Sequence, residues 1–166
     1  MKKTGFLIGF IFLLSFQNSF GQISSYKAQS LFIYNFTKHI KWPSTPDVFK
    51  IGVLGKSQIF NELETTLKGK MVGGKAIQVV LITSAEEATQ CQLLYVPNHK
   101  SRELASVIST INSKDVLVVT ENDLSDEGAG ISFVTIEAKL RFKINQDALN
   151  KGGLQVSGGL VSLALR

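Results

Sequence analysis

The chain has 166 residues, 18 basic and 13 acidic side chains, and a formal net charge of +5. The basic residues are scattered among apolar ones and form no run of like charge, so we expect no nucleic-acid partner. The sequence contains one cysteine, Cys91, which excludes an intrachain disulfide, and two histidines that lie far apart, so we expect no structural metal site.

The N-terminal residues have the pattern of a secretory signal peptide. Two lysines precede an uncharged, mostly apolar run over residues 5–16, and Ser19 and Gly21 place small residues at the spacing of a cleavage site. The run is short for a membrane span, which takes about 20 residues; a retained anchor is the alternative. We expect a signal peptide over residues 1–21 and one periplasmic domain over residues 22–166, with a formal charge of +3 after Lys2 and Lys3 are removed. Nucleotide and nicotinamide cofactors are scarce outside the cytoplasm, and we expect no cofactor.

The first half of the mature sequence predicts alternating helices and strands. A helix capped by Ser24 or Ser25 ends at Pro43, a strand covers residues 49–54, and a second helix begins at Ser57 and ends at Gly69. The apolar stripe of the first helix comprises Ala28, Leu31, Phe32, Phe36 and Ile40. After a turn at Gly73-Gly74, segment 77–82 is continuously apolar apart from Gln78, which is typical of a strand that is covered on both faces.

The second half continues this alternation and then changes. Segments 93–96 and 116–119 predict buried strands, with a helix from Ser101 between them, and this order indicates parallel pairing through right-handed crossovers. Segments 131–136 and 139–144 alternate in polarity and predict an antiparallel hairpin that turns at Glu137 and Ala138. In this register Phe133 pairs with Phe142 and Thr135 pairs with Leu140. Short helices capped by Asn145 and Ser157 follow. We predict an α/β fold: a single Rossmann-like three-layer domain with a mainly parallel sheet and an antiparallel edge hairpin.

A glycine-containing segment, residues 52–57, lies between a predicted strand and a predicted helix. Its spacing matches neither a phosphate-binding loop, which has four residues between the first glycine and the glycine-lysine pair, nor a dinucleotide fingerprint. A tight structural turn explains these glycines better. In a parallel sheet whose first strand lies between the second and third, a ligand would bind beyond the carboxyl ends of the central strands. The predicted ligand-binding residues there are Lys56, Ser57, Asn98 and His99, and ordinary polar loops are the alternative.

The predicted hairpin places three cations, Lys139, Arg141 and Lys143, on one face. Cations on an edge strand prevent sheet-to-sheet aggregation, and they can also dock an acidic partner. We find no nucleophile and base that could be paired, so we expect no catalytic residues and no enzyme activity. Cys91 precedes an apolar run, and we interpret it as a small buried hydrophobe in preference to a reactive thiol.

In its order and spacing of short motifs, nearly the whole mature sequence resembles the YfiR-like family of periplasmic regulatory proteins. The motifs that carry this resemblance are Tyr26-Lys27-Ala28, Tyr34-Asn35-Phe36, Trp42-Pro43, Phe49-Lys50-Ile51-Gly52-Val53-Leu54-Gly55, Gly69-Lys70, Gly74-Lys75, Arg141-Phe142-Lys143-Ile144-Asn145 and Gly153-Leu154-Gln155-Val156-Ser157. The member that defines the family's role has further cysteines, whereas Cys91 stands alone here.

This resemblance implies a non-catalytic regulator, often a homodimer, that binds and represses the periplasmic sensor segment of an inner-membrane signalling protein. The target would be of the diguanylate cyclase or sensor kinase type, and an outer-membrane lipoprotein would remove the inhibitor. The candidate partner-binding residues are Lys139, Arg141, Lys143, Asn145 and Leu149. The alternative hypothesis is a periplasmic module that binds a small ligand and reports it to a membrane receptor.

Overall fold

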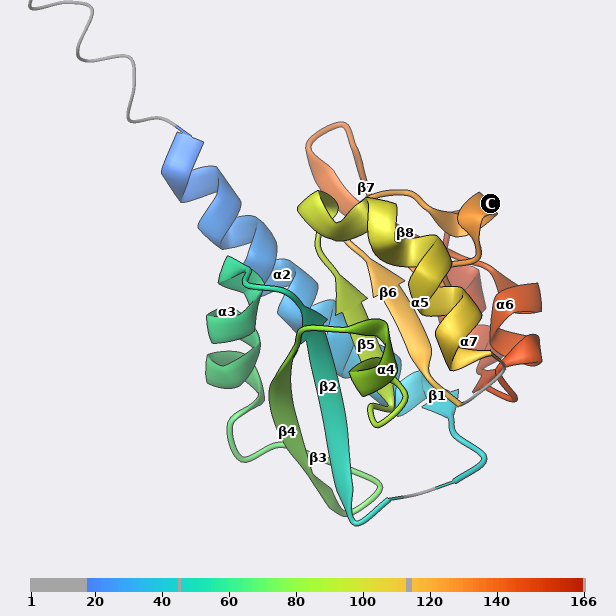
Figure 1. Cartoon of the computed structure of the whole chain (residues 1–166). Helices are drawn as coiled ribbons and strands as arrows, with labels where there is room; N and C mark the ends of the chain where they lie inside the picture. The colour runs from blue at the N-terminus through green and yellow to red at the C-terminus, as the bar shows by residue number, and fades with distance from the viewer. Residues whose placement is uncertain (1–17, 45, 113–114, 166) are drawn as a thin grey trace, which may run out of the picture.

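The structure is a computed structural model that describes residues 18–44, 46–112 and 115–165 (Figure 1). It has a mixed α/β fold built around a seven-stranded sheet in the order β3-β4-β2-β5-β6-β7-β8. Most of the predicted signal peptide, residues 1–17, lies outside the described residues. Within these described ranges, no helix combines the length and the apolar character needed to cross a membrane.

The elements largely follow the predicted order. The strands of the main sheet are β2 (Val48–Leu54), β3 (Met71–Val72), β4 (Lys75–Ile82), β5 (Leu93–Val96), β6 (Leu117–Thr120), β7 (Ile131–Ile136) and β8 (Lys139–Ile144). The helices are α2 (Asn18–His39), α3 (Gln58–Leu67), α4 (Ala85–Ala88), α5 (Leu104–Ile111), α6 (Gln146–Lys151) and α7 (Gly158–Leu163), with 3₁₀ helices η2 (Asn98–Glu103) and η3 (Ser125–Glu127). Two further short strands, β1 (Ile40–Lys41) and β9 (Gln155–Val156), pair with each other in an antiparallel ribbon.

The strand pairing confirms a mainly parallel sheet. Strands β4, β2, β5, β6 and β7 are parallel neighbours, whereas β3 joins β4 and β8 joins β7 in antiparallel pairs. The first strand of the sheet, β2, lies between the next two long strands, β4 and β5, as expected. The predicted antiparallel hairpin stands at one edge of the sheet. The narrower description, a Rossmann-like three-layer domain, stays a prediction.

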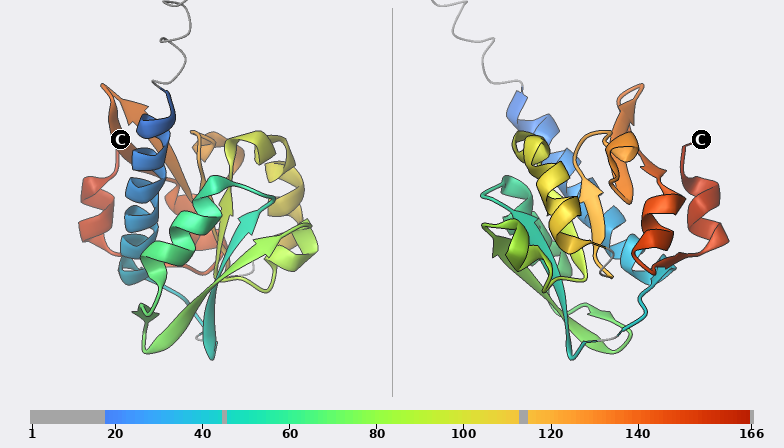
Figure 2. Two further views of the ribbon diagram at one scale, coloured as in Figure 1. Left: turned by 90° about the vertical axis from the view of Figure 1, so that its left-hand side faces the viewer. Right: turned by 45° about the vertical axis from the view of Figure 1, so that its right-hand side comes forward.

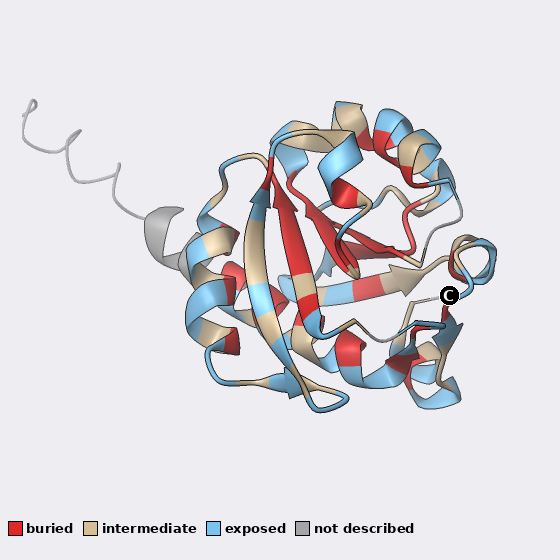
Figure 3. Ribbon diagram, turned by 60° about the horizontal axis from the view of Figure 1, so that its bottom comes forward, coloured by how far each residue is buried: buried red, intermediate tan, exposed pale blue. Residues whose placement is uncertain are grey.

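Buried side chains form two clusters. Successive residues of the central strands belong to different clusters, as Leu93 and Leu94 of β5 do, because successive side chains point to opposite faces of the sheet. The first joins α2 and α3 to the sheet, and the second joins α4 and α5 to it (Figure 2). Phe36 of α2 lies at the centre of the first cluster, with its ring 5.1 Å from that of Phe142 and 5.8 Å from that of Phe133. Every residue of β5 and β6 is buried, which makes these strands the centre of the core (Figure 3).

Two expectations for the first helix are wrong. The described part of helix α2 already includes Asn18, so Ser24 and Ser25 lie inside the helix and not at its N-terminal end. Its buried face is also rotated from the predicted stripe, because Leu31 is 47% exposed while Ile33 is fully buried. Local spacing indicated an amphipathic helix correctly, but only the packed sheet decides which of two neighbouring apolar residues faces inward.

The expectation that segment 77–82 is covered on both faces is also wrong. In β4 only Ile82 is buried, and Leu81 is 40% exposed. This strand lies near the edge of the sheet, where only the short β3 stands outside it. An apolar run interrupted only by Gln78 therefore indicated a strand here, but it did not indicate whether both faces of that strand are buried.

The predicted helix boundaries are confirmed in part. Gly69 follows the end of α3 with φ of +73°, a left-handed conformation that favours glycine. Asn145 and Ser157 cap α6 and α7, since their side-chain oxygens accept hydrogen bonds from the backbone N–H groups of Ala148 and Leu160. Ser101, in contrast, lies within η2, and α5 begins three residues later at Leu104.

Candidate functional site

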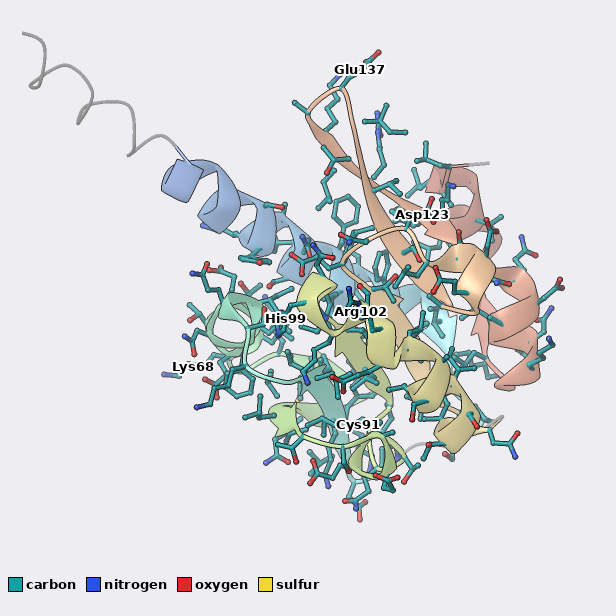
Figure 4. All side chains as sticks on the ribbon, turned by 45° about the horizontal axis from the view of Figure 1, so that its top comes forward. Lys68, Cys91, His99, Arg102, Asp123 and Glu137 are labelled. Carbon is teal, nitrogen blue, oxygen red and sulfur yellow. The ribbon has the colours of Figure 1, made fainter. Side chains whose placement is uncertain are left out.

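The edge hairpin has the predicted register. Phe133 pairs with Phe142 and Thr135 pairs with Leu140, with Glu137 and Ala138 at the turn. Figure 4 shows Glu137 at the tip of the hairpin, away from the body of the protein. Because side chains alternate between the faces of a strand, Lys139, Arg141 and Lys143 share the face opposite Phe142.

The turn of this hairpin is strained. Glu137 has φ of +50° and Ala138 has φ of +59°. Two-residue hairpin turns with both central φ values positive favour asparagine and glycine, because a side chain costs roughly 1–2 kcal/mol per residue in this conformation. The hairpin therefore keeps its register through strand packing and not through favourable turn residues.

The three cations differ in their surroundings. The Lys143 ammonium contacts the Asp123 carboxylate at 2.6 Å, and this hydrogen bond lowers the pKa of Asp123 and raises that of Lys143. Across the described ranges, the other ion pairs are those of Lys75 with Asp47 and Lys100 with Glu103. Lys139 and Arg141 are thus exposed cations without a carboxylate partner in the described structure.

The remaining two predicted partner-binding residues have structural roles. The Asn145 side chain caps α6 and also donates a hydrogen bond from Nδ2 to the carbonyl of Ser125 at 2.7 Å, which ties α6 to η3. Leu149 is 1% exposed and belongs to the first core cluster. Helix α6 folds back onto the sheet and buries Leu149, so in this structure its side chain is not available for contact with a partner.

The outer side of β8 is partly covered by the C-terminal segment. Leu165 forms a parallel bridge with Lys143, and its backbone N–H donates to the carbonyl of Phe142 at 2.9 Å. Residues 139–141 lie farther along the same edge, toward the turn. The exposed cations therefore lie on the distal part of the edge strand.

Three of the four predicted ligand-binding residues line one hollow. Lys56, Ser57 and His99 surround an open hollow of about 600 Å³ between the start of α3 and η2, together with Tyr26 of α2. Asn98 points elsewhere: its backbone N–H donates to Glu121 at 2.8 Å, and its side-chain oxygen accepts a hydrogen bond from Asn122. Ser57 occupies the position before α3 but makes no side-chain capping bond.

At this end of the sheet, a buried polar pair joins α2 to β5. The Tyr95 hydroxyl donates to Oε1 of Gln29 at 2.6 Å, and burial raises the pKa of Tyr95. Both side chains are almost fully buried. Sequence reasoning missed this pair, since a glutamine on a helix is ordinarily solvated and only the fold places it against a tyrosine.

The glycines of segment 52–57 are explained by packing and turn geometry. A Cβ atom on Gly52 would lie 2.7 Å from Ile82 and 2.9 Å from the Cys91 sulfur. Gly55 has φ of +73°, and its N–H donates to the carbonyl of Ile82 at 2.8 Å. These observations support a tight structural turn.

A second hollow was not predicted from the sequence. It has a volume of about 430 Å³ and lies between α5 and α6, with apolar walls that include Ile108, Ile111 and Leu154 and with Asp126 and Asp147 among its polar lining. Its apolar residues were expected to face the core, and nothing in their spacing showed that the two helices leave a gap.

Cys91 is buried, with 2% exposure, and burial raises its pKa to about 11. A thiol with so high a pKa remains protonated and weakly nucleophilic at neutral pH. The interpretation as a small buried hydrophobe is confirmed.

Among the residues that the structure describes, no three His, Cys, Asp or Glu side chains form a group that could hold a metal ion. No curated protein matches the chain. The model of the YfiR/HmsC-like family matches residues 26–165, which include all the strands of the sheet and the edge hairpin. This chain therefore belongs to the YfiR/HmsC-like family.

Proposed function

We propose that this protein is a periplasmic, non-catalytic regulator that binds and represses the periplasmic sensor segment of an inner-membrane signalling protein. Membership of the YfiR/HmsC-like family over residues 26–165 is the observation that carries this proposal. The target is of the diguanylate cyclase or sensor kinase type, and release is brought about by an outer-membrane lipoprotein, as the family resemblance implies.

Export by a cleaved signal peptide is part of the proposal. The cationic start and the apolar run of residues 5–16 support it. Cleavage after Gly21 would shorten α2 by a few residues at its N-terminal end and would leave the buried residues from Tyr26 onward in place. N-terminal sequencing of the protein from the periplasmic fraction tests this step: the expected first residue is Gln22, and an intact Met1 in the cytosol would contradict it.

The exposed cations Lys139 and Arg141 support binding of an acidic surface on the partner. Both are free of ion pairs in the described ranges, so binding would not require breaking an existing interaction. Oppositely charged surfaces accelerate association and select partners. Lys143 contributes less in this proposal, because Asp123 already neutralises it.

Affinity capture from solubilised inner membranes tests the function. The purified, exported protein is used as bait, and an Arg141→Glu variant with an unchanged thermal unfolding midpoint is the matched control. We expect the wild type to retain a membrane signalling protein that the variant retains weakly. Capture of the same proteins by both baits would contradict docking through this edge.

A homodimer is also part of the proposal, by family resemblance. Leu31 of α2 is 47% exposed and Leu163 of α7 is 67% exposed, and these apolar side chains support the first and last helices as the contact. Sedimentation equilibrium of the wild type and of Leu31→Asp and Leu163→Asp variants tests it. A monomeric wild type at micromolar concentration would contradict it.

The second candidate function, binding of a small ligand that is reported to a receptor, is supported by the hollow at Lys56, Ser57 and His99. Its lysine, its hydroxyl and its position at the N-terminal end of α3 would suit an anionic molecule. A thermal shift screen against periplasmic metabolites tests it, because a ligand stabilises a protein in proportion to the logarithm of its excess over Kd. A hit whose shift persists in Lys56→Gln and His99→Gln variants would place the ligand elsewhere.

A further inference from the structure

The edge strand β8 has backbone groups that face away from the sheet. The carbonyl of Phe142 accepts a hydrogen bond from Leu165, which lies outside the β7–β8 pair. In an antiparallel pair, alternate residues of a strand direct their N–H and C=O groups to the same side. Leu140 is two residues before Phe142, so its N–H and C=O also point outward from the sheet.

The C-terminal segment shows that backbone groups on this side of β8 can pair with another extended residue. Leu165 bridges Lys143 in the parallel direction, and its N–H donates to the carbonyl of Phe142. No strand in the described structure pairs with residues 139–141 on this side, since β8 ends the strand order. The distal half of β8 therefore offers free backbone donors and acceptors beside a segment that already pairs in this way.

The side chains around this free stretch define the chemistry of what it would bind. Lys139 and Arg141 flank Leu140, point to one face and have no ion-pair partner within the described ranges. An extended segment that alternates acidic and apolar residues would place its acidic side chains beside these cations and its apolar side chains on the opposite face, beside Leu140.

We propose that the distal half of β8 binds an extended, acidic segment of a partner protein by β-strand addition, next to the position of Leu165. This inference deepens the proposed function and rests on it for the identity of the partner. A second copy of this chain is the poorer occupant, because two β8 edges would bring Lys139 and Arg141 close to the same cations of the other copy.

Synthetic peptides test this inference without the membrane partner. The probe is a fluorescently labelled peptide of strand length in which glutamate alternates with valine, and its control has lysine in place of glutamate. Binding to the exported, purified protein is measured by fluorescence anisotropy. We expect the acidic peptide to bind and its affinity to fall with added salt, and the lysine peptide to bind at least tenfold more weakly.

Backbone N-methylation of the same peptide separates strand addition from side-chain docking. Methyl groups on one alternate set of peptide nitrogens would block pairing with β8, and methyl groups on the other set would face solvent. We expect one methylated peptide to lose affinity about tenfold and the other to retain it, as loss of one or two backbone hydrogen bonds predicts. Equal affinity of the two would overturn the inference.

A variant of the protein gives an independent readout. Leu140→Pro removes the outward N–H but leaves the hydrogen bonds between β7 and β8, and Leu140→Val retains the N–H as the matched control. We expect peptide affinity to fall about tenfold for proline and to stay within twofold for valine. Because proline could unfold the hairpin, the unfolding midpoint is measured for both variants. If the midpoint of Leu140→Pro is lower than that of the wild type, the N-methylated peptides alone decide whether strand addition occurs.

The outcomes distinguish failure of this inference from failure of the proposed function. If the acidic peptide binds with the expected N-methyl pattern while membranes yield no partner, the edge binds strands and the proposed function fails. If membranes yield a partner that Leu140→Pro and Leu140→Val bind equally, the proposed function stands and strand addition is overturned. Strand addition by an acidic segment would also be overturned if the acidic peptide did not bind. The same holds if the protein self-associated through β8 and the peptide did not compete with this self-association.

Discussion

In β5 and β6 every residue is buried, whereas at the tip of the β7–β8 hairpin five consecutive residues, 135–139, are exposed. Both regions belong to one sheet, yet the central strands are held by apolar packing on two faces and the hairpin tip by its backbone ladder alone. Substitutions at the centre should therefore change stability, while substitutions at the tip should change binding. The predictions below test this division, from the largest expected effect to the smallest.

Phe36→Ala should destabilise the protein by about 3–5 kcal/mol, because it removes a fully buried ring that packs against Phe133 and Phe142. Chemical denaturation measures this loss. Lys27→Ala, on the same helix but exposed, is the matched control and should change stability by less than about 0.5 kcal/mol. Similar losses for both variants would contradict the placement of the core.

Gly52→Ala should cost about 1–3 kcal/mol, since the added Cβ would lie 2.7 Å from Ile82 and 2.9 Å from the sulfur of Cys91. Gly158→Ala is the control, because no atom lies within 4 Å of its added Cβ at the start of α7. Thermal unfolding compares the two. A neutral Gly52 variant would indicate that β2 is loosely packed against Ile82 and Cys91.

The double variant Glu137→Asn with Ala138→Gly should stabilise the hairpin by about 1 kcal/mol, because both residues have positive φ and the new pair suits this turn. Its unfolding midpoint is compared with that of Thr135→Asn, which lies outside the turn. If the double variant is no more stable than the wild type, the turn is not strained as described.

Asp123→Asn should slightly destabilise the protein at pH 7 by removing the ion pair with Lys143. The folded-state pKa of Asp123 lies below its ordinary value of 3.8, so this contribution is present above that value and is lost as pH falls through the lowered pKa. Unfolding midpoints of wild type and variant should differ at neutral pH and converge in acid. A constant difference across this range would assign the effect to another cause.

The sequence predicted the elements whose pattern is local. The register of the hairpin follows from strict alternation around Phe133 and Phe142, and the caps at Asn145 and Ser157 follow from residue type and the helix after each. What failed depends on contacts between distant segments. The rotation of the buried face of α2 and the pairing of β1 with β9 have no signal in a short window of sequence.

The candidate sites divide in the same way. Spacing placed Lys139, Arg141 and Lys143 on one face, but only the loop after β6 brings Asp123 to Lys143. Sequence order placed Lys56, Ser57 and His99 at the same end of the sheet, while Asn98 turned away to bond with Glu121 and Asn122. The burial of Leu149 depends on how α6 folds back, which residue spacing does not determine.

The central claim is that this protein acts by binding a partner through its β8 edge. The most direct test of it is the affinity of this protein for the periplasmic segment of the captured membrane protein. It is measured by titration for the wild type, for Lys139→Glu with Arg141→Glu, and for Lys151→Glu, which reverses an exposed cation on α6. We predict at least a tenfold loss for the hairpin double variant alone, with unfolding midpoints unchanged in all three. Equal affinities for the wild type and the hairpin variant would contradict the account.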